Sequence, residues 1–144
     1  MKIRIRIAAA ALVTIVVTFA ACSTGGTVRN MQSSATVPGA EGELALSDGG
    51  NQNTEILVSV KHLADPRKLR TGATNYIVWS RPFAGNGEPQ NLGALDVDEN
   101  LNGRLRTVTP FRQFSLFITA EPAPNVVKPS GEPLLWTNVS RTAE

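Results

Sequence analysis

The 144-residue sequence has a single cysteine, Cys22, and a single histidine, His62. One thiol cannot form a disulfide within the chain, which excludes a scaffold stapled by disulfides. The common zinc sites need several cysteine or histidine ligands, so one residue of each kind excludes those sites as well. We therefore expect no metal site and no bound cofactor.

The sequence also lacks the motifs of common catalytic sites. It has no Gly-x-Ser-x-Gly turn that would expose a nucleophilic serine. Asp96 and Asp98 form a pair of carboxylates, but no neighbour in sequence would make one an acid and the other a base. His62 ends a predicted strand, where we expect a surface residue. The protein is therefore not expected to be an enzyme.

The N-terminal apolar run, from Ile7 to Phe19, is shorter than the about 20 residues that a membrane-spanning helix needs. A basic start at residues 1–6 precedes this run, and two small residues at 20–21 follow it. These are the three parts of a secretory signal, which we assign to residues 1–21. The alternatives are an uncleaved membrane anchor and an ordinary cleavage site with a cysteine beside it by chance.

The segment Phe19-Ala20-Ala21-Cys22 resembles the lipobox of bacterial lipoproteins. The cysteine lies at the end of the apolar run, and the flexible stretch Ser23-Thr24-Gly25-Gly26 follows it. The resemblance implies cleavage just before Cys22 and a diacylglycerol on its sulfur. We therefore expect Cys22 to be the lipidation site.

Lipidation would place the protein in the cell envelope. Each acyl chain contributes ~0.8 kcal/mol per buried methylene, so two or three chains hold a protein durably on a membrane. The expected location is the outer membrane, on its periplasmic or surface face, or the outer face of the cytoplasmic membrane. In a cell with two membranes, Ser23 rather than aspartate after the cysteine favours the outer membrane.

The charge of the chain changes when the signal is removed. The full sequence has 14 basic and 12 acidic residues, and cleavage removes Lys2, Arg4 and Arg6. Eleven basic residues then face 12 acidic ones, which is a formal charge of −1. A nearly neutral chain has no overall attraction to nucleic acid or to anionic lipid, so we expect no nucleic acid partner.

Composition divides the mature chain into two parts. Residues 22–43 contain the lipidated cysteine and then small and polar residues with little apolar periodicity, which predicts a flexible linker. A coil of this length spans about 25 Å. Residues 44–140 are enough for one domain with a modest core.

Apolar residues alternate with polar ones in this domain, which is the pattern of half-buried strands. Ile56, Val58 and Val60 share one face of a strand, and Phe114, Leu116 and Ile118 share another, with Ser115, Phe117 and Thr119 on the opposite face. A single helical turn is expected at residues 65–69, with Asp65 as N-cap and Pro66 at the first position. About seven strands are predicted: Leu44–Leu46, Thr54–His62, Asn75–Arg81, Leu92–Val97, Arg104–Val108, Gln113–Glu121 and Leu134–Val139.

Seven short strands in about one hundred residues predict an all-β fold, an immunoglobulin-like β-sandwich. Trp79 on the third strand agrees with this fold, because such sandwiches commonly bury a large aromatic residue there. The disulfide of antibody domains cannot form with one cysteine. A small β-barrel is the alternative.

Several short segments between residues 75 and 135 resemble the extracytoplasmic domain of RskA-type anti-sigma factors. Those domains carry a Tyr-x-Val-Trp-like strand and a Thr-x-Glu-Pro segment before a Pro-Ser/Thr-Gly turn. The resemblance implies the sandwich fold, but it implies no sigma-factor binding, because the cytoplasmic domain and spanning helix of that family have no counterpart in this sequence. The matching segments are Asn75-Tyr76-Ile77-Val78-Trp79, Leu92-Gly93, Phe117-Ile118-Thr119-Ala120-Glu121-Pro122 and Pro129-Ser130-Gly131-Glu132-Pro133.

The segment from Asp96 to Asn102 places oxygen ligands at every second position, as a calcium loop does. The pattern then fails, because Leu101 stands where the turn needs glycine and Thr107 stands where a bidentate glutamate is needed. A solvated acidic turn between two strands is the simpler interpretation, and calcium stays open.

Basic and aromatic side chains are the remaining candidates for binding. Arg67, Lys68 and Arg70 crowd one loop, and Arg104 and Arg106 share one strand face, where charges commonly deter aggregation. The aromatic residues are interpreted first as packing residues, since a sugar platform would need an exposed aromatic row. These are Tyr76, Trp79, Phe114 and Trp136.

The favoured hypothesis is a non-catalytic envelope lipoprotein whose β-sandwich binds or spaces another envelope component, either a protein or a polymer. The alternative is an extracytoplasmic ligand-sensing module that acts with a separate membrane regulator. Both hypotheses depend on acylated Cys22 as the membrane contact.

Overall fold

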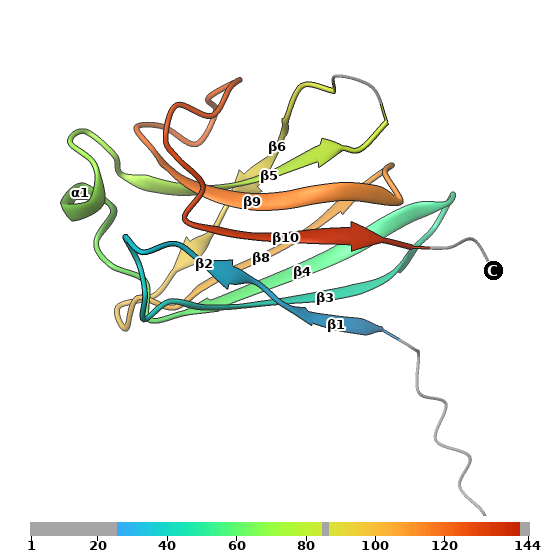
Figure 1. The fold of residues 1–144 in the computed structure, drawn as a ribbon, viewed down its shortest axis with the longest axis horizontal. Coiled ribbons are helices and arrows are strands. Elements are labelled where there is room, and N and C mark those ends of the chain that lie inside the picture. The colour runs from blue at the N-terminus through green and yellow to red at the C-terminus, as the bar shows by residue number, and fades with distance from the viewer. Residues whose placement is uncertain (1–25, 85–86, 142–144) are drawn as a thin grey trace, which may run out of the picture.

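The alternating segments form strands that pair into two antiparallel sheets of five strands each, and the sheets pack face to face as a β-sandwich (Figure 1). The computed structural model describes residues 26–84 and 87–141. Sheet A contains, in spatial order, β1 (Thr27–Asn30), β3 (Glu41–Gly49), β4 (Asn53–Lys61), β8 (Gly103–Thr109) and β7 (Asp96–Val97). Sheet B contains β2 (Gln32–Ser33), β10 (Leu135–Ser140), β9 (Gln113–Glu121), β5 (Asn75–Pro82) and β6 (Gln90–Ala94).

The strand order confirms the predicted sandwich. Strands β3, β4, β8 and β7 have the order and pairing of strands A, B, E and D of an immunoglobulin-like domain, and β10, β9, β5 and β6 have those of G, F, C and C′. No strand ladder joins the two sheets in the part of the chain that the structure describes, so the small barrel is not the fold.

The predicted helical turn also forms. Helix α1 (Pro66–Leu69) follows Asp65, whose side chain accepts a hydrogen bond of 3.0 Å from the backbone N–H of Arg67. Proline occupies the first helical position, where a backbone donor is not needed.

The predicted linker over residues 22–43 is wrong from Thr27 onward, because strands β1 and β2 lie within it. The two short strands extend both sheets: β1 pairs with β3, and β2 pairs with β10. Met31, between them, donates its N–H to the carbonyl of Gly42 at 2.8 Å and buries its side chain. Val37 and Ala40 are also buried. The segment lacks alternation because it changes sheets after four residues, so its pairing depends on backbone bonds.

The predicted strand over Leu92–Val97 is divided between the two sheets. Strand β6 belongs to sheet B and β7 to sheet A, with buried Leu95 at the crossing. Gly93 has a φ of 130°, which only glycine adopts readily, and the register shifts opposite it between Val78 and Trp79. This bend and the two N-terminal strands explain why ten strands form where about seven were predicted.

The core lies between the sheets and is built from the predicted alternating positions, including Ile56 and Val58 of β4 and Leu116 and Ile118 of β9. Trp79 is fully buried but lies outside this core, in a second cluster with Phe117 that packs against Trp136. Because its side chain points away from the core, Trp79 lies on the outer face of sheet B.

Candidate functional site

A row of three aromatic residues crosses the outer face of sheet B. Trp136 of β10 lies directly opposite Phe117 of β9, and Phe117 lies opposite Trp79 of β5. The rings of Trp79 and Phe117 are stacked, with centroids 6.4 Å apart and planes inclined by 15°. Trp79 is fully buried, whereas Trp136 at the other end of the row is only partly buried. The row therefore runs from a covered end to an accessible one.

A polar row lies beside the aromatic row on the same face. Arg81, Ser115 and Asn138 occupy opposite positions on β5, β9 and β10, two residues along from the aromatic row. The hydroxyl of Ser115 donates to Oδ1 of Asn138 at 2.8 Å. The guanidinium carbon of Arg81 lies 5.4 Å from the ring centroid of Phe117, within the range of a cation–π contact. Amide, hydroxyl and guanidinium groups thus border an aromatic surface.

The polar row and two members of the aromatic row, Phe117 and Trp136, form the floor of an open groove of about 620 Å³. Trp79, the third member of the aromatic row, is fully buried and lies outside the groove. Its wall comes from the connection between β9 and β10, which rises above sheet B on the side away from sheet A (Figure 1). We call this the aromatic groove, and it is lined by Arg81, Ser115, Phe117, Pro129, Gly131, Glu132, Pro133, Trp136 and Asn138.

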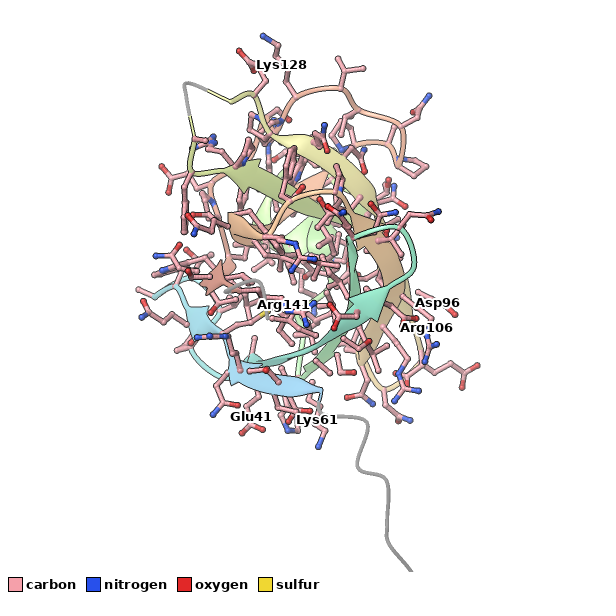
Figure 2. The ribbon with its side chains drawn as sticks, turned by 90° about the vertical axis from the view of Figure 1, so that its right-hand side faces the viewer. Glu41, Lys61, Asp96, Arg106, Lys128 and Arg141 are labelled. Carbon is pink, nitrogen blue, oxygen red and sulfur yellow. The ribbon has the colours of Figure 1, made fainter. Side chains whose placement is uncertain are left out.

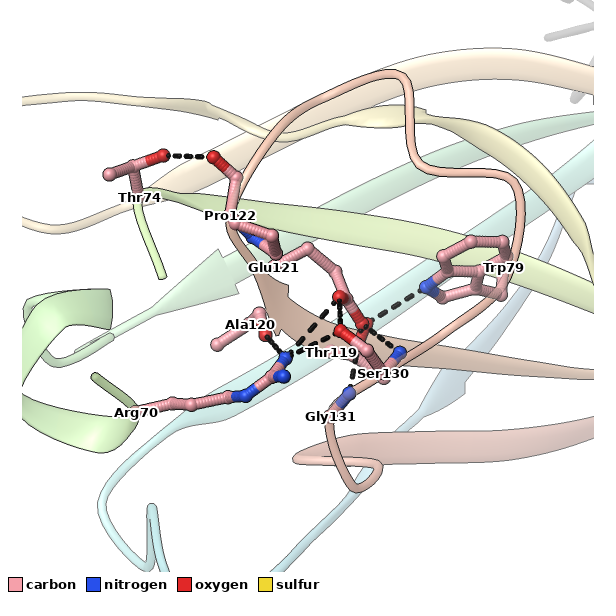
Figure 3. Close-up of polar contacts among 9 residues, drawn as sticks. All are labelled: Arg70, Thr74, Trp79, Thr119, Ala120, Glu121, Pro122, Ser130 and Gly131. Atoms are coloured by element: carbon pink, nitrogen blue, oxygen red, sulfur yellow. Dashed lines mark hydrogen bonds and ion pairs between the residues drawn. The ribbon is translucent and has the colours of Figure 1, made fainter. Parts of the chain in front are cut away.

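The wall is held by the buried carboxylate of Glu121, whose side chain is 0% exposed (Figure 3). Its Oε1 accepts hydrogen bonds from Thr119 Oγ1 at 2.6 Å, from Ser130 N at 2.9 Å and from Gly131 N at 3.1 Å. Its Oε2 accepts from the Ser130 hydroxyl and from Nη1 of Arg70, the latter at 3.4 Å. Glu121 therefore ties the start of the connection to residues nine and ten positions further on.

The ionisation of Glu121 is set by two opposing effects. Burial disfavours its charge and on its own would raise the pKa. Hydrogen bonds from the side chains of Ser130 and Thr119, and from the backbone of Gly131 and Ser130, favour the charge and lower the pKa below its ordinary value of 4.5. The folded protein therefore holds Glu121 as a carboxylate.

A second clamp holds the far side of the connection. The side-chain amide of Asn91 on β6 donates to the carbonyls of Pro124 at 3.0 Å and Val126 at 2.8 Å. Val126 packs against the cluster that contains Trp79 and thereby covers it. Because both ends of the connection are hydrogen-bonded to sheet B, the wall of the aromatic groove is preorganised.

Cys22, the predicted lipidation site, lies outside the described residues, so its acylation stays a prediction.

The predicted acidic turn at 96–102 does form, with Asp98 at its centre. Oδ1 of Asp98 accepts from the N–H groups of Asn100 at 2.9 Å and Asn102 at 2.8 Å, and Oδ2 accepts from the Asn102 amide at 3.2 Å. Leu101 adopts a φ of 61° in this turn. In residues 26–84 and 87–141, no three acidic, cysteine or histidine side chains gather as a metal site would require.

The other predicted candidates are dispersed over the surface. His62 is exposed, as expected for the end of a strand. Arg67 pairs with Asp65 at 2.8 Å, and Arg106 pairs with Glu55 at 3.1 Å. Charged side chains of both signs are spread around the domain in Figure 2. These arginines therefore do not converge on one binding site.

Sequence reasoning missed the aromatic groove because it assigned the aromatic residues to packing. One signal was present: Phe117 shares its strand face with Ser115 and Thr119, the polar phase of β9. It also missed the Glu121 network, in which hydrogen bonds join Trp79 to Thr119 and Thr119 to Glu121.

No helix within the described ranges is long and apolar enough to cross a membrane. Comparison with known proteins finds no family model that matches this chain and no significant match among curated proteins or solved structures.

Proposed function

We propose that the protein is a non-catalytic envelope lipoprotein that binds a carbohydrate-containing envelope polymer in the aromatic groove. Acylated Cys22 anchors it, and the β-sandwich presents the groove to the polymer. The observation that carries the proposal is the cross-strand row of aromatic residues bordered by a polar row on the same face of sheet B.

The chemistry of the groove suits sugar rings. A sugar ring has C–H groups on its faces and hydroxyls around its edge, so it stacks on an aromatic face and hydrogen-bonds to polar side chains beside it. Trp136 supplies the accessible aromatic surface, and Arg81 and Asn138 supply donors and acceptors one row away. A largely apolar concavity with a few placed polar groups is the usual form of a ligand site.

The position of the groove also supports this proposal. Strand β1, where the described chain begins, belongs to sheet A, whereas the aromatic groove lies on the outer face of sheet B (Figure 1). A domain held near a membrane through its N-terminal side therefore leaves the groove free to meet a polymer.

The test is co-sedimentation of the mature protein with purified insoluble envelope polysaccharide. We expect Trp136→Ala to weaken the affinity about tenfold or more, because stacking of one nucleic-acid base on an aromatic side chain contributes about 1–3 kcal/mol and a sugar ring would stack on the same kind of surface. Asn138→Ala serves as a second variant, since Asn138 is exposed and its loss leaves the core intact. Phe83→Ala is the matched control, because Phe83 is 47% exposed and lies outside the groove.

Three outcomes are decisive. Binding lost in both groove variants and kept in Phe83→Ala supports the polymer. A photo-crosslinker at position 138 tests for a protein partner instead. Capture of one envelope protein, without any polymer binding, would overturn this proposal. Mass spectrometry of the mature N-terminus tests the anchor separately, and an unmodified Cys22 would refute the envelope location.

A further inference from the structure

We infer that a second site, distinct from the aromatic groove, binds the phosphate group of a membrane lipid through Arg29, Arg112 and Arg141. The inference rests on the proposed anchor at Cys22 for its choice of lipid as the source of phosphate. The pocket itself is defined by the described residues alone.

The site is an open pocket of about 680 Å³ at one end of the sandwich. Its lining includes the first strand residue, Thr27, the last strand residue, Ser140, and the β3–β4 turn at residues 48–52. Figure 1 shows β1 beginning and β10 ending at this same end, and Figure 2 looks onto it with Arg141 in the middle of the view. The chain therefore enters and leaves the fold beside the pocket.

The pocket is basic although the mature chain is nearly neutral. Three arginines and one acidic residue, Asp48, line it. Arg141 is engaged by Asp48, with Nη2 to Oδ1 at 3.1 Å, and it donates from Nη1 to the carbonyl of Ser47 at 2.9 Å. Within residues 26–84 and 87–141, neither Arg29 nor Arg112 forms an ion pair. Among the described residues, the guanidinium groups of Arg29 and Arg112 thus have no acidic partner, and Arg141 adds a third positive charge to the pocket.

Arg29 shows most directly that an acceptor is needed. It lies opposite Leu44 in the β1–β3 ladder, so its side chain starts from the inner face of sheet A, at the open edge of the sandwich. Its Nε is buried and has no hydrogen-bond partner among the described residues. Leaving a buried donor of a charged group unpaired is costly, so a movement of the Arg29 side chain that brings this donor to an acceptor would be favourable. Arg29 also lines the pocket, and a phosphate oxygen there is an acceptor that arginine binds well.

The length of the tether indicates where the phosphate comes from. Four residues separate Cys22 from Thr27, which lines the pocket. Even fully extended, this segment spans about 18 Å from Cys22 to Thr27. An acylated Cys22 would therefore keep the pocket within reach of the headgroups, where lipid phosphates are abundant.

The experiment uses the mature chain with Cys22→Ser, which removes acylation, and measures its binding to two kinds of vesicle. We expect binding to vesicles of phosphatidylcholine with phosphatidylglycerol, and weaker binding to phosphatidylcholine alone. Arg29→Gln and Arg112→Gln should each weaken binding about fivefold, the usual effect of one basic residue at an anionic surface. Arg104→Gln removes the same charge from an exposed site outside the pocket and should change binding little.

Binding of inorganic phosphate distinguishes a lipid headgroup from free phosphate as the ligand of the pocket. Vesicle binding that depends on Arg29 and Arg112, without saturable binding of inorganic phosphate, supports the lipid headgroup. Saturable binding of inorganic phosphate that both arginines control, without vesicle binding, keeps the anion site and overturns its assignment to lipid. Equal binding by the Cys22→Ser chain with and without each arginine substitution, with unchanged thermal unfolding, would refute the site. Since acylation is absent in this chain, such a failure leaves the anchor and the aromatic groove untouched.

Discussion

The indole Nε1 of Trp79 donates a hydrogen bond of 2.9 Å to Oγ1 of Thr119, and that hydroxyl donates in turn to the buried carboxylate of Glu121 at 2.6 Å (Figure 3). Trp79 lies on β5, whereas Thr119 and Glu121 lie on β9. The chain of hydrogen bonds thus joins the aromatic cluster to the clamp that holds the groove wall. A substitution of Glu121 should therefore also disturb the structure of the aromatic groove.

Replacing the carboxylate of Glu121 should destabilise the protein. Glu121→Gln keeps the shape but removes the charge that accepts from five donors, and it places an amide N–H₂ among those donors. Hydrogen bonds to a buried charge are the strong ones, so we expect the free energy of unfolding to fall by about 2–3 kcal/mol. Denaturant unfolding measures it. Glu132→Gln, an exposed change nearby, should stay within about 0.5 kcal/mol of the native protein. Equal stabilities of the native protein and Glu121→Gln would show that the charge of Glu121 contributes nothing to stability.

Stability should depend on Glu121 in acid. Since its folded-state pKa lies below the ordinary 4.5, the folded protein binds this proton less well than the unfolded chain does. The stabilisation is complete above the unfolded-state pKa and is lost as the pH falls through the folded-state pKa. Thermal unfolding is measured for the native protein and Glu121→Gln over a series of acidic pH values. The difference in stability between the two should shrink as the pH falls. A difference that stays constant with pH would contradict this.

Tyr76, the only tyrosine, should titrate at an unusually high pH. Burial, followed by the nearby charge of Asp65, raises the pKa of its phenol to about 12, and the phenol donates to the carbonyl of Ala64 at 2.6 Å. The tyrosinate absorbance should therefore appear near pH 12 in the folded protein and near pH 10 in denaturant. Its stabilising effect is complete below pH 10 and is lost between the two pKa values. Tyr76→Phe should remove this alkaline change and cost about 1 kcal/mol through the lost hydrogen bond. A folded-state titration near pH 10 would mean that the ring is solvated.

Calcium should leave the turn at 96–102 unchanged. Hydrogen bonds from the backbone and side chain of Asn102, and then from the backbone of Asn100, lower the pKa of Asp98 despite an opposing effect of desolvation. Both carboxylate oxygens are thus already used within the turn. We expect the same Tm with calcium and with a chelator, and a lower Tm for Asp98→Ala. A calcium-dependent Tm that disappears in Asp98→Ala would show that the turn rearranges to bind the ion.

Local pattern was sufficient for much of the sandwich. Ile56, Val58 and Val60 alternate with polar residues, and period two is the property that lets one face of a strand enter a core. The helical turn was equally local, since Asp65 and Pro66 favour a helix start through their own geometry. The lipidation site at Cys22 was also inferred from adjacent residues, and it stays a prediction.

Contacts distant in sequence decided the rest. Alternation separates the two faces of β5 and β9 but does not say that the outer face is covered, because the cover over Trp79 comes from a connection held by Asn91 and Glu121. Strands β1 and β2 were not predicted because they have no alternating apolar pattern. Backbone pairing with β3 and β10 stabilises them instead. Arg29 and Arg112 are far apart in the chain and meet in one pocket only because the sheets stack. Local residue patterns specify most of the strands. What lies beside each strand depends on tertiary contacts, because hydrogen bonds and packing between distant segments have no local signature.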